Sequence, residues 1–133
     1  MEVGSIIVDT NTYASFKRGN PFAVDIMKRA REIVFTPVVL GELYSGFNLS
    51  KKQKENLSEF NELLKNEKVE MVNINETTSK YYANIYKELK YKGKPIPSND
   101  IWIAASAMEF DFNVFSNDKH FNFINDIRVI SEG

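Results

Sequence analysis

Four acidic residues are the side chains most able to support chemistry in this sequence: Asp9, Glu42, Asp100 and Asp118. Carboxylates placed a few Å apart repel one another, and some would have to remain protonated. A divalent cation removes that cost, and an all-oxygen set of ligands suits Mg²⁺ or Mn²⁺. Such a cluster binds substrate phosphates and activates a water molecule.

Each acid also has a purely structural interpretation, which the sequence leaves open. Asp9 could cap a helix, and Asp118 could be a turn residue. Asp100 could complement a helix dipole, and Glu42 could be a solvated charge on a helix surface. The hypothesis of a shared site therefore depends on whether the fold brings all four together.

Composition narrows the classes of chemistry. The chain has 133 residues, which suits one domain over 1–133 with a single core. It has no cysteine and one histidine, which excludes a thiolate zinc site and a histidine pair for acid–base catalysis. The formal net charge is −1, so a nucleic-acid partner would have to be met by local lysine patches. No apolar run has the length of a membrane span or a signal-peptide core, and we therefore expect a cytoplasmic protein.

Short β-branched runs alternate with longer amphipathic stretches along the whole chain. We expect strands at residues 6–8, 33–35, 69–72, 112–115 and 127–130. We expect helices at residues 10–18, 21–30, 37–47, 50–66, 76–91 and 98–108. Thr10 or Asn11, Thr36 and Ser98 are the expected caps of three of these helices. This alternation predicts an α/β fold with a mostly parallel sheet.

That fold would gather the acids at one edge, because the carboxyl ends of parallel strands meet there. Asp9 and Asp118 each follow a strand. The helix that begins near Ser98 runs antiparallel to the strand it precedes, so Asp100 in its first turn returns to the same edge. Glu42 lies about 8 Å along a helix that starts at that edge, at 1.5 Å per residue.

Four segments of the chain together resemble the PIN-domain ribonucleases, and in particular the VapC-type toxins of toxin–antitoxin modules. They are IVDTN at 7–11, TPVVLGEL at 36–43, NDIWIAA at 99–105 and SNDKHF at 116–121. Any one of them is a weak signal, but they occur in family order with family-like spacing, and the resemblance extends over essentially the whole chain.

The resemblance implies a three-layer α/β/α sandwich around a mainly parallel five-stranded sheet. It implies a Mg²⁺-dependent endoribonuclease, with Mn²⁺ as an alternative cation, that acts on RNA, forms homodimers and is inhibited by a small VapB-like antitoxin. By the match, Asp9, Asp100 and Asp118 are the metal ligands, and Glu42 holds or orients the attacking water. Asn11 and Ser116 fall where the family places polar groups that support the ligands.

Two other functions stay open at this stage. One is a PIN-domain nuclease of RNA processing that is not a toxin. The other is a non-enzymatic receiver-like module that takes phosphate in an acidic Mg²⁺ pocket. The second would need paired acids directly after the first strand, whereas Asp9 is followed by Thr10 and Asn11.

Some residues near these motifs have a structural and a functional interpretation. His120 could be a base, although a turn residue is the simpler interpretation, and Trp102 is expected in the core. Lysines 87, 90, 92 and 94, with Tyr86 and Tyr91, could line an RNA path or form an ordinary solvated helix face.

Overall fold

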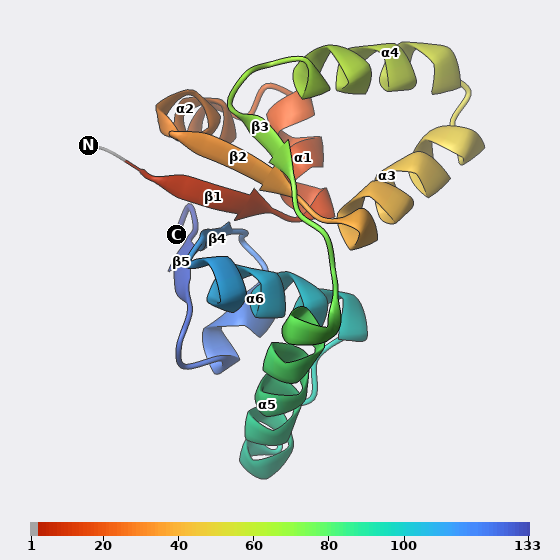
Figure 1. The fold of residues 1–133 in the computed structure, drawn as a ribbon. Helices are drawn as coiled ribbons and strands as arrows, with labels where there is room; N and C mark the ends of the chain where they lie inside the picture. The colour runs from red at the N-terminus through yellow and green to blue at the C-terminus, as the bar shows by residue number, and fades with distance from the viewer. Residues whose placement is uncertain (1–2) are drawn as a thin grey trace.

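A computed structural model describes residues 3–133 and has a single five-stranded sheet at its centre (Figure 1). Its order is β3-β2-β1-β4-β5, and each neighbouring pair is parallel. The strands are β1 (Ser5–Val8), β2 (Glu32–Phe35), β3 (Val69–Met71), β4 (Asn113–Phe115) and β5 (Arg128–Ile130). The expected mainly parallel sheet is confirmed, and all of its neighbouring strand pairs are parallel.

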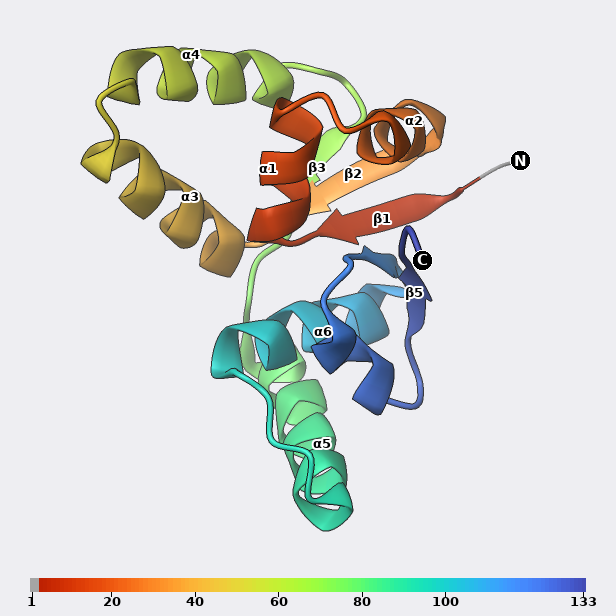
Figure 2. The same cartoon turned by 180° about the vertical axis from the view of Figure 1, so that it is seen from behind.

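Helices cover both faces of this sheet. They are α1 (Thr10–Lys17), α2 (Pro21–Arg29), α3 (Pro37–Leu49), α4 (Gln53–Leu64), α5 (Glu76–Lys92) and α6 (Ser98–Phe110), followed by the short 3₁₀ helix η1 (Lys119–Phe123). Helices α1 to α4 gather on one side of β1 and β2, and α5 and α6 lie on the other side (Figure 2). Parallel strands joined by right-handed crossovers produce this arrangement, because the order of the strands reverses at β1. The predicted three-layer α/β/α sandwich is confirmed.

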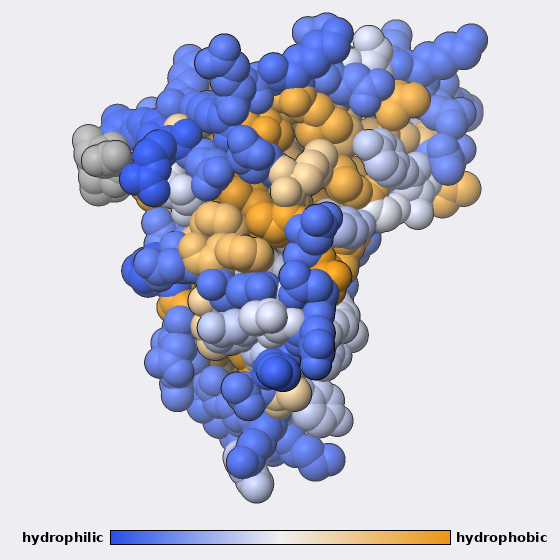
Figure 3. Space-filling view, viewed as in Figure 1, coloured by the Kyte–Doolittle hydropathy of each residue, from blue (hydrophilic) through white to orange (hydrophobic). Residues whose placement is uncertain are grey.

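The sheet is buried on both faces, which explains why its central strands read as continuous apolar runs. Ile6, Ile7 and Val8 of β1 have no exposed surface. Small residues on α6, among them Ala104 and Ala105, are also fully buried, so this helix packs closely against the core. In Figure 3, apolar residues gather at the centre of the face shown, and charged and polar residues surround them.

Helix caps differ in detail from the expectation. Asp9 itself caps α1, and Thr10 and Asn11 lie inside the helix. Pro97 occupies the cap position of α6, and Ser98 is its first helical residue, with its hydroxyl 2.9 Å from that of Tyr82. The expected Thr36 cap of α3 is confirmed, since the Thr36 side chain accepts a hydrogen bond from the Val39 amide. At α1 the Asp9 carboxylate accepts from the Thr12 amide, so the cap lies one residue before Thr10. At α6 proline fixes an extended backbone before the helix but offers no side-chain acceptor.

Two further expectations are corrected by tertiary packing. Trp102 is only half-buried and packs on Tyr82 of α5, with ring centroids 4.3 Å apart, so it joins two helices rather than filling the core. The expected helix at 50–66 begins only at Gln53, because Ser50 ends α3. Within residues 3–133, none of the helices has the length and apolar character that crossing a membrane requires.

Candidate metal centre

All four predicted acids line one pocket of about 220 Å³ at the carboxyl edge of the sheet. Asp9 follows β1, and Asp118 follows β4 by three residues. Asp100 is the third residue of α6, and Glu42 is the sixth of α3. Asn11, Asn99 and His120 complete much of the lining. The fold thus brings together residues that are up to about 110 positions apart in the chain.

Asp9 is held by its neighbours through both carboxylate oxygens. Oδ1 accepts a hydrogen bond of 2.8 Å from the Thr12 amide at the start of α1. Oδ2 accepts one of 2.5 Å from the Ser116 hydroxyl, whose oxygen in turn accepts one of 2.9 Å from the Asp118 amide. Asp9 is 5% exposed and Ser116 is 1% exposed. Ser116 therefore ties the loop after β1 to the loop after β4, a supporting position of the kind that the resemblance implies.

Asp100 is the other buried acid, with 7% of its surface exposed. Burial raises the pKa of its carboxyl, and the negative charges of Asp118 and Asp9 act in the same direction. The hydrogen bond from His120 lowers that pKa and offsets part of the rise. The position in the first turn of α6 also favours a negative charge, because the amide groups there point toward it.

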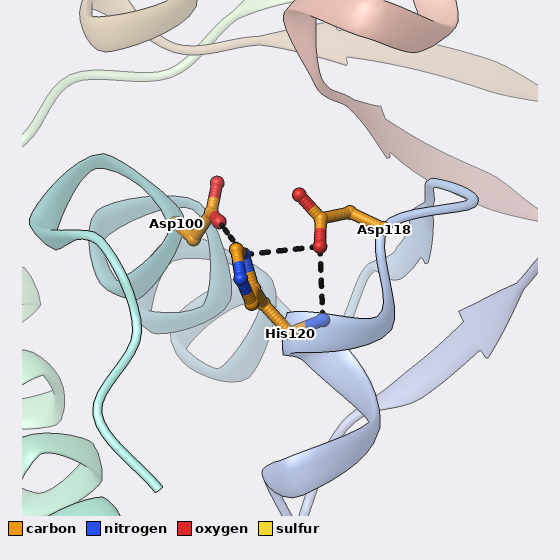
Figure 4. Close-up of side chains that lie close together, drawn as sticks. All are labelled: Asp100, Asp118 and His120. Carbon is orange, nitrogen blue, oxygen red and sulfur yellow. Dashed lines mark hydrogen bonds and ion pairs between the residues drawn. The ribbon is translucent and has the colours of Figure 1, made fainter.

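His120 takes part in the site, which corrects the expectation of a turn residue alone. Its amide does serve the turn, donating to Asp118 Oδ1 at 2.9 Å. Its side chain, however, points between two carboxylates (Figure 4): Nδ1 lies 2.9 Å from Asp100 Oδ2 and 3.0 Å from Asp118 Oδ1. The sequence shows that His120 lies two residues after Asp118, but it does not show where the ring points. The 3₁₀ turn of η1 directs the ring toward α6.

Glu42 is exposed on α3 but is fixed by polar partners from the neighbouring elements. Its Oε1 accepts a hydrogen bond of 2.7 Å from the Thr10 hydroxyl, and its Oε2 accepts one of 3.0 Å from the Asn99 side chain. The sequence alone did not indicate Thr10 and Asn99 as partners of Glu42. The one signal that could have identified them is their position directly beside Asp9 and Asp100 in the sequence. Asn11 lines the pocket from the first turn of α1.

The donors present fit a divalent cation. One ligand atom each from Asp100, Asp118 and His120 lie within 4.8 Å of one another. Ligands that share one Mg²⁺ ion at 2.0–2.1 Å lie at most about 4.2 Å apart, so small side-chain rotations would bring this set to bonding distance. Carboxylate oxygens suit Mg²⁺ and Mn²⁺, and an imidazole nitrogen favours the transition metal of the two.

The structural interpretations of Asp9 and Asp118 also hold, since each caps the helix that follows it. The two interpretations are compatible. Helix amino ends stabilise the charged carboxylates when no cation is bound, and the side-chain oxygens still line the pocket.

The raised pKa of Asp100 predicts a stability effect in EDTA. Because the folded protein binds this proton more tightly than the unfolded chain, the group's contribution falls as pH rises from about 3.9 through the raised pKa, and it stays low above it. Asp100→Asn should therefore melt higher than the parent protein at pH 7.5, by about 3–5 °C for about 1 kcal/mol relieved. The difference should shrink in mildly acidic buffer. If the variant melts lower than the parent protein at both pH values, the charged Asp100 carboxylate does not destabilise the metal-free fold.

The position of His120 predicts a contribution to metal affinity. Its replacement in His120→Ala should weaken Mn²⁺ binding by about tenfold, the lower end of the loss seen when a group that supports a metal site is removed. Mg²⁺ binding should weaken less, because Mg²⁺ prefers oxygen ligands. Titration calorimetry with each cation measures both constants, and Lys119→Ala is the matched control on the same turn. Equal affinities in parent and variant would restrict His120 to its backbone role.

Comparison with known proteins places these features in context. The family model for the PIN domain matches residues 6–126. Ribonuclease VapC2 of Rickettsia felis is 28% identical over 115 residues, which is 84% of each chain. Among solved structures, the VapBC2 complex of Rickettsia felis bound to a promoter DNA fragment has a TM-score of 0.84 at 23% identity, over 97% of this chain and 99% of that one.

The DNA-bound VapBC complex of Salmonella typhimurium has a TM-score of 0.82 at 22% identity, over 98% of both chains. At these identities the two solved structures support the fold. The family model spans strands β1 to β4, from Ile6 onward, and all four acids. The chain belongs to the PIN domain family.

Proposed function

We propose that this protein is a metal-dependent endoribonuclease of the VapC type and the toxin of a two-protein toxin–antitoxin module. The observation that carries the proposal is the convergence of Asp9, Glu42, Asp100 and Asp118 on one pocket. The PIN family and the similarity to Ribonuclease VapC2 support RNA as the substrate. Family membership sets aside the receiver-like alternative.

In the proposed site, Asp9, Asp100 and Asp118 hold Mg²⁺ or Mn²⁺, and His120 completes or orients the set. When bound, the cation would supply electrostatic activation of the scissile phosphodiester and of a water molecule. Ser116 fixes Asp9, so that the ligand needs no reorganisation during the reaction. Asn11 is proposed to contribute a further polar contact at the pocket wall.

Glu42 is the residue best placed to accept a proton from the attacking water. It is exposed to solvent and is oriented by Thr10 and Asn99 rather than by the other acids. With water as the nucleophile and the 3′ oxygen as the leaving group, the P–O3′ bond breaks and the 2′-hydroxyl takes no part, so the products would carry a 5′-phosphate and a 3′-hydroxyl. A general base must lie within hydrogen-bond reach of the proton that it removes. In this proposal Glu42 takes that role, and no histidine is required for it.

The toxin role rests on the VapC likeness, and it implies a VapB-like antitoxin and activity in the cytoplasm. The Rickettsia and Salmonella structures are named as VapBC complexes. An antitoxin arginine would suit this pocket, because a guanidinium donates two parallel hydrogen bonds to a carboxylate. The homodimer implied by the resemblance stays a prediction.

RNA cleavage should require Mg²⁺ or Mn²⁺ and stop in EDTA, because the site is rich in hard oxygen ligands. Asp100→Asn should cut at least about a hundredfold more slowly, the scale on which loss of a group that stabilises charge acts. Asp25→Asn is the matched control, since Asp25 is an exposed acid on α2 that pairs with Arg29. Gel assays with single-stranded RNA measure the rates. Undiminished cleavage in EDTA, or by Asp100→Asn, would refute the metal mechanism.

Production of this protein alone should arrest the growth of a permissive bacterial host, and the Asp100→Asn variant should not. The physical reason is that the toxic effect requires hydrolysis at the acidic pocket. Growth curves after induction, with immunoblots to show equal soluble amounts, test the toxin role. Unimpaired growth at high soluble levels of an RNA-cleaving protein would instead favour a PIN nuclease of RNA processing.

A further inference from the structure

A second pocket, of about 250 Å³, lies where the chain folds back at the carboxyl end of α5. Its floor is made by the apolar side chains of Leu89, Ile96 and Ile101, and its rim carries Tyr86 and Lys90. Tyr86 is 51% exposed, although it is a large aromatic residue. We call this cavity the α5 pocket.

The shape of the α5 pocket follows from a left-handed turn. Helix α5 ends at Gly93, whose φ of 66° reverses the chain. Residues 94–97 then run back beside α5 to the start of α6, as Figure 2 shows. The hydroxyls of Tyr82 and Ser98 lie within hydrogen-bonding distance, and this contact holds the end of the segment against α5.

Helix α5 and the segment that follows it carry more lysines than acids, in a chain that is nearly neutral. Residues 80–97 contain five lysines and one acid, Glu88, whereas the whole chain has a net charge of −1. Glu88 pairs with Lys92 at 2.6 Å. The Nζ atom of Lys87 lies 5.9 Å from the ring centre of Tyr91, and the Nζ atom of Lys94 lies 5.3 Å from the ring centre of Phe123. Within residues 3–133, no carboxylate forms an ion pair with Lys87, Lys90 or Lys94.

One short segment, residues 96–101, contributes lining residues both to the α5 pocket and to the pocket of the four acids, which we call the acid pocket. We call this segment the wall between them. Ile96 and Ile101 line the α5 pocket, while Pro97 and Asp100, their direct neighbours in sequence, line the acid pocket. A strand of nucleic acid whose phosphate lies at the acids could therefore place an adjoining nucleotide over this wall.

We propose that the α5 pocket is a subsite for a nucleobase of single-stranded RNA, beside the phosphate that is cleaved. Tyr86 provides a ring on which the base stacks, and Lys90, Lys87 and Lys94 contact the phosphates on either side. Aromatic stacking combined with a cationic groove is how proteins bind single strands. The inference deepens the proposed ribonuclease function and rests on it.

The charge of the surface favours RNA over other occupants. A second copy of this chain in a two-fold interface would face its own lysines, and like charges in contact oppose association. A protein partner would need an acidic segment to match this surface. RNA supplies both a flat apolar base and a negative charge at each nucleotide.

The test is binding of a 5′-fluorescein-labelled, mixed-sequence single-stranded RNA of twelve nucleotides, followed by fluorescence anisotropy in EDTA so that it is not cut. Tyr86→Ala should weaken binding by about tenfold, the scale of one lost base–aromatic stack, and Tyr86→Phe should keep most of the affinity. Lys90→Gln should weaken binding and reduce the salt slope by about 0.7. Lys54→Gln, which removes an exposed lysine on α4, is the matched control and should change neither.

Steady-state cleavage with Mg²⁺ adds a second measurement. Tyr86→Ala should raise KM more than it lowers kcat, because it leaves the acids in place. An RNA that carries 2-aminopurine should lose fluorescence on binding to the parent protein, and less on binding to Tyr86→Ala. Unchanged melting temperatures ensure that the comparison is between folded proteins. If Tyr86→Ala does not fold, Lys90→Gln at the rim of the same pocket still tests the subsite.

Several outcomes would overturn the subsite. Equal RNA affinity and KM in Tyr86→Ala and the parent would do so, and so would an equal effect of Lys54→Gln and Lys90→Gln. Loss of dimer mass or of antitoxin binding in Tyr86→Ala, with RNA binding intact, would assign the pocket to a protein interface. The ribonuclease proposal is tested separately: if the subsite fails while Asp100→Asn is inactive, only the subsite is wrong.

Discussion

The register between β1 and β4 is the constraint on which the site depends. These strands are parallel, and Val8 lies opposite Phe115, so the residues that leave the sheet next are Asp9 and Ser116. Their side chains meet in a 2.5 Å hydrogen bond, and the Ser116 oxygen also receives the Asp118 amide. One strand pairing thus fixes the relative positions of two of the four acids, and a shift of one residue would turn Asp9 to the other face of the sheet.

Electrostatics in this pocket is a balance between burial, repulsion and compensating dipoles. Asp9 and Asp100 are buried, and burial with neighbouring charges raises the pKa of Asp100. Asp9 and Asp118 cap helices, and Asp100 lies in a first turn, so amide groups offset part of the repulsion. His120 adds a donor between two of the carboxylates. The pocket can therefore hold its geometry while keeping the negative field that attracts a cation.

The same stretch of chain serves both the acid pocket and the lysine-rich surface of α5. Residues 96–101 lead from the loop after α5 into α6. Ile96 and Ile101 line the α5 pocket, whereas Pro97, Asn99 and Asp100 line the acid pocket. The acids suit a cation and the lysines suit phosphates, so the two adjacent surfaces carry side chains of opposite charge. This arrangement would let an anionic polymer approach a site that would otherwise repel it.

The sequence alone determined the fold class and the five strands, because apolar periodicity and strand–helix alternation are local properties of a chain. It also placed the acids at one edge, since parallel strands leave little choice. Tertiary structure decided what local patterns do not contain. The 3₁₀ turn after Asp118 aims His120 at Asp100, and packing of α5 on α6 leaves Trp102 half-buried against Tyr82. Thr10 and Asn99 contact Glu42 only because α3 passes between the starts of α1 and α6. Thr10 is separated from Glu42 by 32 positions in the sequence and Asn99 by 57, so both contacts depend on the completed fold.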